Sequence, residues 1–254
     1  MFSFYGVLET VFIPYQKKLN TMAKNDLNQT THRREFLGSI ATGAAAFGAA
    51  TLGMPLNLHA EPKLNHDYAS DADEWFKQIN GKHRIVFDAT GPHEIFPFAW
   101  PKVFLLTNNA TGTPEKENSV VVVLRHNAMP YAMDSRLWEK YKFGEVFKVE
   151  DPKTKAPSLR NPFWKPQEGD YKVPGIGIVA IGINELQDSG VMFCVCEMAM
   201  TVFSAVVAEG MGKDAAEIKK EWMAGLLPAI QPVPSGVWAI GRAQEKGCAY
   251  IFAG

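Results

Sequence analysis

The sequence contains little cysteine, no surplus of charge of either sign and no long uninterrupted apolar run. Only three of its 254 residues are cysteine, and 26 basic residues stand against 27 acidic ones. Three cysteines confined to the C-terminal third are too few for the disulfide framework of a secreted mini-protein. A balanced charge gives no electrostatic footprint for nucleic acid or for an anionic membrane surface. We therefore expect no nucleic-acid partner, and each cysteine has to be judged on its own.

Motifs for nucleotide cofactors and for serine hydrolases are also missing. The glycines of Gly175-Ile176-Gly177 and Gly182 fit neither the dinucleotide spacing nor the Walker spacing, and no Gly-x-Ser-x-Gly segment occurs. We expect no cofactor. A structural zinc ion needs about four ligands, so a site built from Cys194, Cys196, Cys248 and a histidine is a weaker alternative, and we expect no metal.

The first sixty residues have the order of a bacterial export signal, which is basic, then apolar, then small. Arg33 and Arg34 precede residues 37–60, which contain no Asp, Glu, Lys or Arg. Glycine, threonine and proline dilute this stretch, whereas a membrane anchor needs about 20 strongly apolar residues. We interpret residues 1–60 as a twin-arginine leader, recognised by the twin-arginine export machinery, and we expect the remainder to work in the periplasm or elsewhere outside the cytoplasm.

Two details of this leader stay open in the sequence. Leu58-His59-Ala60 is a middling cleavage site that would leave Glu61 as the new N-terminus, and an uncleaved anchor is the alternative. Either Met1 or Met22 is the natural start, because the segment after Met22 is itself a compact basic region.

The rest of the chain alternates between apolar strand-like runs and segments of helical spacing. This alternation predicts one domain with a mostly parallel sheet covered by helices on both faces. We expect a tail or short helix over residues 61–82, and a three-layer α/β/α sandwich of about five strands over residues 83–254. The expected strands are 84–88, 119–124, 191–196, 230–233 and 249–252, and the expected helices are 95–109, 134–141, 176–189, 198–209, 214–224 and 235–245.

Residues 142–174 differ in character from their surroundings, because five prolines stand among charged and aromatic residues. Proline removes a backbone donor and interrupts both helices and inner strands. We expect this segment to be an inserted loop or lid.

Polar side chains follow the expected strands, where parallel α/β sheets bind their ligands. Arg125 and His126 follow the second strand. The candidate ligand-binding residues are Asp88, Thr90, His93, Asn127, Glu197, Ser235 and Gly236. Taken one at a time, such residues more often cap helices or shape turns, and that alternative stands beside the functional one.

Cys196 is the best candidate for chemistry, because a thiol at the start of a helix faces backbone N–H groups that stabilise a thiolate. A helix terminus gives about 0.3–1 kcal/mol, less than one pKa unit at about 1.4 kcal/mol. Strong activation needs a second cation, and Arg125 or His126 is placed to supply it. An inert, buried Cys196 is an equal alternative, and Cys194, two residues earlier in the strand, is expected to pack in the core.

Three segments, Gly190–Cys196, Val233–Val237 and Ala243–Ile251, resemble the DsrE/DsrF-like sulfur-relay family. The resemblance covers about residues 83–253 and implies a small parallel α/β sandwich that assembles into a homo-oligomer, a trimer or hexamer. In the sulfur-carrying members the cysteine that ends the third strand carries a persulfide. By motif position, this role falls on Cys196, with Arg125 or His126 assisting.

Two hypotheses of function follow from the sequence. The first is an exported thiol-based sulfur handler that takes a small sulfur compound, or meets an unknown protein partner, at Cys196. The second is a non-catalytic oligomeric binding or scaffold protein, in which the strand ends and the insertion line a pocket. The sequence leaves open whether the protein is an enzyme.

Overall fold

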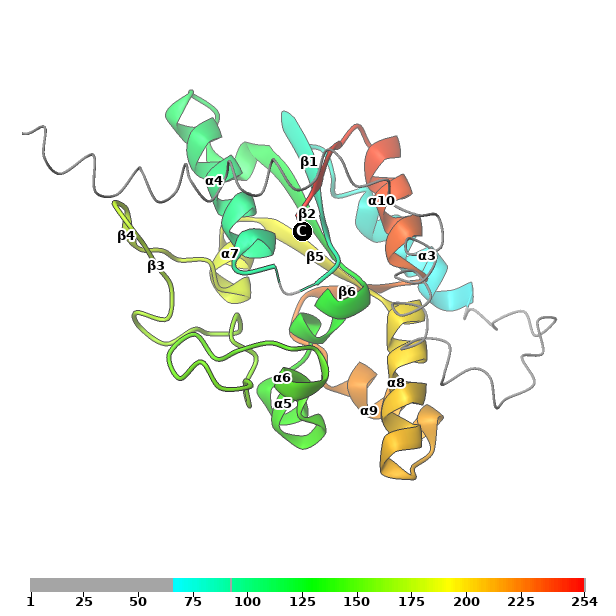
Figure 1. The fold of residues 1–254 in the computed structure, drawn as a ribbon. Coiled ribbons are helices and arrows are strands. Elements are labelled where there is room, and N and C mark those ends of the chain that lie inside the picture. Colours follow the sequence, from blue (N-terminus) through cyan, green and yellow to red (C-terminus); the bar gives the residue numbers. More distant parts are fainter. Residues whose placement is uncertain (1–65, 92, 254) are drawn as a thin grey trace, which may run out of the picture. The chain divides into compact units, whose positions relative to one another are not determined.

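Five parallel strands form the centre of the protein in the computed structural model (Figure 1). Their order across the sheet is β6-β5-β2-β1-β7, and every neighbouring pair is parallel. The strands are β1 (His83–Ala89), β2 (Asn118–Leu124), β5 (Val191–Cys196), β6 (Ile230–Val233) and β7 (Ala249–Phe252). The predicted five-stranded parallel sheet is confirmed.

The structure describes residues 66–91 and 93–253, which belong to one unit of the chain, Pro62–Gly254. The predicted leader, with Arg33, Arg34 and the cleavage site, lies outside the described residues. Within the described ranges, none of the helices combines the length and apolar composition that a membrane crossing requires.

Burial on both faces explains the strand sequences. All seven residues of β2, in the middle of the sheet, are buried, as are the last five of β1. A run of β-branched residues suits this position, because both sides of the strand pack against helices. The edge strand β7 differs, since its four residues are all exposed.

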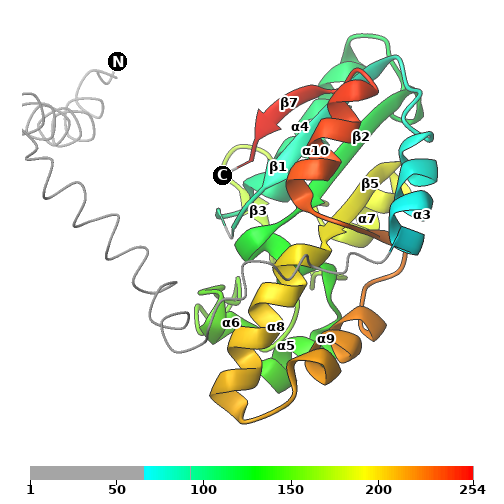
Figure 2. The same cartoon turned by 90° about the vertical axis from the view of Figure 1, so that its right-hand side faces the viewer.

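Helices cover the sheet on both faces, so the predicted three-layer sandwich is also confirmed. Helices α4 and α7 lie on the face of Phe87, Val122 and Phe193, and α3 and α10 lie on the face of Val86 and Val123. Figure 2 shows α10 across the sheet, with α5, α8 and α9 beyond the strand ends. The helices are α3 (His66–Phe76), α4 (Phe96–Ala110), α5 (Ser135–Tyr141), α6 (Phe143–Val146), α7 (Ile183–Asp188), α8 (Glu197–Met211), α9 (Ala215–Ala224) and α10 (Gly236–Glu245), with short 3-10 turns at Glu115–Glu117 and His126–Ala132.

The core extends further towards the N-terminus than the sequence suggested. Phe76, at the end of α3, is fully buried and meets the ring of Trp238 edge-on, with ring centroids 5.8 Å apart. Helix α3 is therefore part of the layer that it shares with α10.

The prediction of a helix over residues 176–189 is wrong for the first half of that range. Residues 172–178 form a hairpin of β3 (Lys172–Val173) and β4 (Gly177–Ile178), and α7 begins only at Ile183. Gly175 and Gly177 have φ of +80° and +98°, a region that favours glycine and ends a helical path.

The insertion over residues 142–174 is tied to the core rather than lying loosely over it. Asn161, which is fully buried, donates from Nδ2 to the carbonyl oxygens of Tyr131 and Met133, both at 2.8 Å. Its Oδ1 accepts from the N–H of Phe163 at 3.1 Å. One amide therefore satisfies three backbone groups that burial would otherwise leave without partners.

Replacement of this amide tests how firmly the insertion is held. Asn161→Ala leaves the carbonyls of Tyr131 and Met133 buried without donors, so we expect the free energy of unfolding to fall by about 2–4 kcal/mol. In urea denaturation, the control Asn109→Ala, at an exposed position near the end of α4, should stay within about 0.5 kcal/mol of the unaltered protein. Equal midpoints for the two variants would show that the insertion is not anchored in this way.

Candidate functional site

The carboxyl ends of β1 and β2 are joined by an ion pair. In the sheet register Asp88 lies opposite Val123, and Arg125 directly follows β2. The guanidinium donates from Nε to Asp88 Oδ1 at 2.6 Å and from Nη2 to Oδ2 at 2.9 Å. Such a two-bond pair fixes the plane of the guanidinium as well as its position.

Burial and a further hydrogen-bond partner fix the geometry of this ion pair. Asp88 is 1% exposed, and its Oδ2 also accepts a hydrogen bond from the Tyr250 hydroxyl at 2.8 Å. The pKa of Arg125 is raised, mainly by the hydrogen bond to Asp88, which outweighs the opposing effect of burial; the electrostatic interaction with Asp88 raises it further. A buried carboxylate deprived of its cation is costly, so Asp88 holds Arg125 at this edge of the sheet.

Gly236, the first residue of α10, gives the Arg125 side chain room to lie where it does. A Cβ at Gly236 would lie 2.5 Å from Cβ and 2.7 Å from Cδ of Arg125, closer than real contacts allow. Ser235, just before it, caps the helix by accepting from the N–H of Trp238 at 3.2 Å. Of these two candidate residues, Gly236 shapes the site and Ser235 caps a helix.

Cys196 ends β5 and is also the N-cap of α8. Its Sγ accepts from the backbone N–H of Ala199 at 3.2 Å, and the residue is 6% exposed. An N–H at the start of a fifteen-residue helix is one of the groups that stabilise an anionic sulfur. Arg125 follows β2, the strand that pairs with β5. We call Asp88, Arg125, Cys196, Gly236 and Tyr250 the strand-end cluster.

Four of the other candidate residues have local partners. Glu197 pairs with Lys219 at 2.7 Å, and the ring of His93 lies against Phe252. The N–H of Asn127 donates to the carbonyl of Thr90 at 2.9 Å. The contacts of Thr90, His93 and Asn127 lie in the turns after β1 and β2, and the Glu197–Lys219 pair joins α8 to α9.

His126 follows Arg125 directly, but it is placed differently. Its backbone has φ of +50°, and its ring meets Phe203 of α8 edge-on, with ring centroids 5.8 Å apart. The ion pair with Asp88 instead makes Arg125 the cation whose position is fixed by the sheet.

Tyr250 is not among the site residues predicted from the sequence, which lie at or after the ends of the predicted strands. It lies inside β7, opposite Val86, and reaches Asp88 because β7 pairs with β1. Only the strand order reveals this neighbour, and the sequence does not give that order.

The remaining cysteines lie in settings that disfavour a thiolate. Cys194 is completely buried, and burial raises the pKa of its thiol. Burial also raises the pKa of Cys248, to about 11. In the part of the chain that the structure describes, no three His, Cys, Asp or Glu side chains lie close enough together to hold a metal ion.

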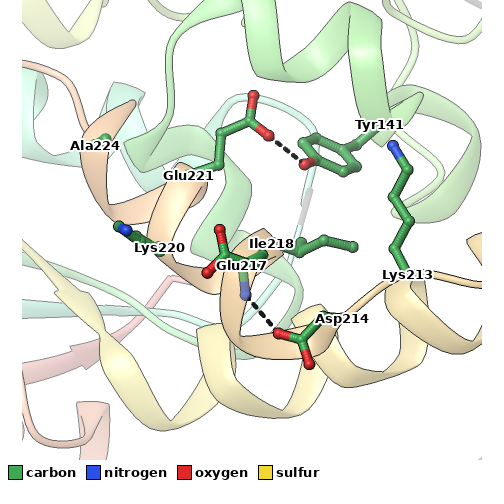
Figure 3. A pocket seen from close by; sticks show the side chains of 8 residues that line it. All are labelled: Tyr141, Lys213, Asp214, Glu217, Ile218, Lys220, Glu221 and Ala224. Atoms are coloured by element: carbon green, nitrogen blue, oxygen red, sulfur yellow. Dashed lines mark hydrogen bonds between the residues drawn. The ribbon is translucent and has the colours of Figure 1, made fainter.

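A hollow of about 520 Å³ between α5 and α9 lies apart from this cluster (Figure 3). Its carboxylate Glu221 accepts from the hydroxyl of Tyr141 at 2.6 Å and from Lys140 and Arg136. Hydrogen bonds from Lys140 and Tyr141 lower the pKa of Glu221 to about 2. The hydroxyl of Tyr141 and the carboxylate of Glu221 satisfy each other, and none of the lining residues belongs to the strand-end cluster.

Comparisons with known proteins do not identify a family for this chain. No family model matches the chain, and no curated protein matches it significantly. The solved structure of a protein of unknown function from Methanobacterium thermoautotrophicum aligns with 67% of this chain and 99% of its own, with a TM-score of 0.36 and 18% identity.

Two glycines of α10 test the close packing at Arg125. Gly236→Ala places a methyl group on the stem of Arg125, so we expect the free energy of unfolding to fall by about 1–3 kcal/mol. Gly241→Ala, in the same helix and with no atom within 4 Å of the new methyl, should instead stabilise by about 0.5–1 kcal/mol. Urea denaturation compares them, and equal effects would contradict the close approach.

Proposed function

We propose that this protein is an exported, thiol-based sulfur handler in which Cys196 accepts sulfane sulfur as a persulfide and passes it on. The supporting observation is the placement of Cys196 Sγ, which accepts from the N–H of Ala199 at the start of α8. Cys196 ends the strand that pairs with β2, and the arginine that follows β2 is fixed by Asp88. The resemblance of segments 190–196, 233–237 and 243–251 to the DsrE/DsrF-like family belongs to this proposal.

The transfer step needs no oxidant or reductant. The Cys196 thiolate attacks the outer sulfur of a donor R–S–SH, a new S–S bond forms, and the S–S bond of the donor breaks. The leaving thiolate R–S⁻ takes the electron pair, and Cys196 is left as Cys–S–SH. An acceptor thiolate reverses the same exchange.

Within this proposal, Arg125 stabilises negative sulfur before and after the transfer. Asp88 occupies Nε and Nη2 of the guanidinium, which leaves the Nη1 donors for an anionic donor or leaving group. The Arg125 side chain is 28% exposed, so a small molecule can reach it. Asp88 and Tyr250 are positioning residues in this scheme, because they act through Arg125.

Export and assembly complete the proposal. A twin-arginine leader at Arg33 and Arg34 would carry the domain across the membrane already folded, so sulfur loading before export is compatible with it. The exposed edge strand β7, with Tyr250, Ile251 and Phe252 on its surface, supports a homo-oligomer.

A non-catalytic binding protein is the second candidate, and one observation favours it. Cys196 is only 6% exposed, and a thiol so covered reacts slowly unless its surroundings open. Under this alternative the strand-end cluster only holds the strand ends together, and the thiol of Cys196 is unreactive.

Mass spectrometry separates the two candidates. After treatment with inorganic polysulfide, we expect intact protein to gain one sulfur atom, about 32 Da, located at Cys196 by peptide mapping. Cys196→Ser should abolish the gain, and Cys248→Ser should keep it, because Cys248 is equally covered but its pKa is raised to about 11. No adduct at Cys196, with the thiol still alkylated after unfolding, would favour the binding protein.

A further inference from the structure

Strand β7 forms one edge of the sheet, and among the described residues only β1 pairs with it (Figure 2). The N–H of Ala253 donates to the carbonyl of Asp88 in β1 at 2.9 Å. The backbone groups of successive residues in a strand point to alternate sides, so Ile251 also faces β1. The N–H and C=O groups of Tyr250 and Phe252 therefore point outward, away from the sheet.

The side chains of this edge are apolar and exposed. Tyr250, Ile251 and Phe252 are 44%, 38% and 51% exposed. Natural proteins protect an open edge strand with charged residues, proline or a bulge, because its unpaired backbone groups pair readily with another chain. Strand β7 contains neither a charged residue nor proline. Its composition therefore suits an edge that is paired with another strand.

The outward groups of β7 are complementary to themselves. Tyr250 lies beside Val86 in the register with β1, so Tyr250 and Phe252 lie on the face of α10, and Ile251 lies on the face of α4. Two antiparallel copies, related by a two-fold axis at Ile251, bring Tyr250 of each copy opposite Phe252 of the other. Each outward N–H then meets an outward C=O, and each aromatic ring meets another.

This pattern favours a second copy of the chain as the partner strand. An isologous contact brings each residue close to its counterpart, so a charged edge would repel itself. The edge β7 has no charge to repel. The central position, Ile251, meets its own copy as one apolar side chain against another.

We propose that two copies of this protein pair through β7, antiparallel about a two-fold axis at Ile251, so that their sheets join into one. This inference rests on the homo-oligomer of the proposed function and gives it an interface, but it does not depend on sulfur transfer. Phe252 of the second copy then lies beside Tyr250, whose hydroxyl is bonded to Asp88 at 2.8 Å. The second copy thus adds a side chain next to the strand-end cluster.

The size of the contact sets the expected affinity. Strand β7 contributes four residues from each copy, whereas standard interfaces bury about 1,200–2,000 Å² and involve many more. We therefore expect a reversible dimer with a dissociation constant on the order of 10 μM. A two-fold contact occurs in a dimer or in a hexamer with two-fold symmetry, but not in an isolated trimer.

Sedimentation equilibrium of the full chain, from about 1 to about 200 μM, measures this constant. Ile251→Lys places two ammonium groups on directly opposed residues, whose Cβ atoms lie about 5 Å apart, and should weaken the dimer at least about tenfold. The matched control is Ile176→Lys, which carries the same change in the turn between β3 and β4, at a position 74% exposed. This control should leave the dissociation constant unchanged.

A charge swap tests the register. Ile251→Glu should also weaken the dimer, whereas an equimolar mixture of Ile251→Lys and Ile251→Glu should associate within about threefold of the unaltered protein, because opposite charges then face each other. Recovery in the mixture also shows that neither variant has lost its fold. Failure of the mixture to recover would refute the two-fold axis at Ile251.

Two further outcomes would overturn the inference. An oligomer that Ile251→Lys leaves intact, or an isolated trimer, would refute the β7 interface while keeping the homo-oligomer. An unaltered chain that stays monomeric at about 200 μM would refute the homo-oligomer as well. Polysulfide labelling of Cys196 in Ile251→Lys separates these failures from a failure of sulfur transfer, because the gain of sulfur should persist in the monomer.

Discussion

The carboxylate of Asp88 and the guanidinium of Arg125 join the ends of β1 and the central strand β2, and the chemistry proposed at Cys196 depends on this pair. A half-buried ion pair contributes little net stability, because desolvation offsets the attraction between the charges. Its effect here is orientation. Nε and Nη2 of Arg125 are held by one carboxylate, so the direction of its remaining donors is fixed. These donors lie at the carboxyl end of the sheet, where Cys196 ends β5.

Two elements distant in sequence contribute to that orientation. Helix α10 begins with Gly236, which leaves room for the stem of Arg125. Strand β7 brings Tyr250 to Asp88, 162 residues away in sequence. At the end of β5, helix α8 presents the Ala199 N–H to Cys196. Each of these contacts alone is an ordinary helix cap or packing contact. The chemical proposal rests on their occurring together at the carboxyl ends of β1, β2 and β5.

The sequence predicted most of the fold, because burial leaves a direct trace in it. The apolar run of β2 from Val120 to Leu124 and the strand that ends in Cys196 are recognisable as strands in the sequence, and their alternation with helices specifies the layers. It also placed Arg125 and Cys196 at strand ends. It did not predict the hairpin over residues 172–178, where glycine conformation outweighed an apolar helical pattern, nor Tyr250, because strand order is a long-range property.

The central claim is that Arg125 assists the Cys196 thiolate. The most direct measurement is the rate constant for alkylation of Cys196 by iodoacetamide in the native protein at pH 7. Arg125→Gln should slow it about three- to tenfold, a loss of about 0.7–1.4 kcal/mol. The control Arg84→Gln, whose side chain bonds only the carbonyls of Gly81 and Lys246 within the described chain, should leave the rate unchanged. Equal rates in a folded Arg125→Gln variant and in the unaltered protein would contradict the claim.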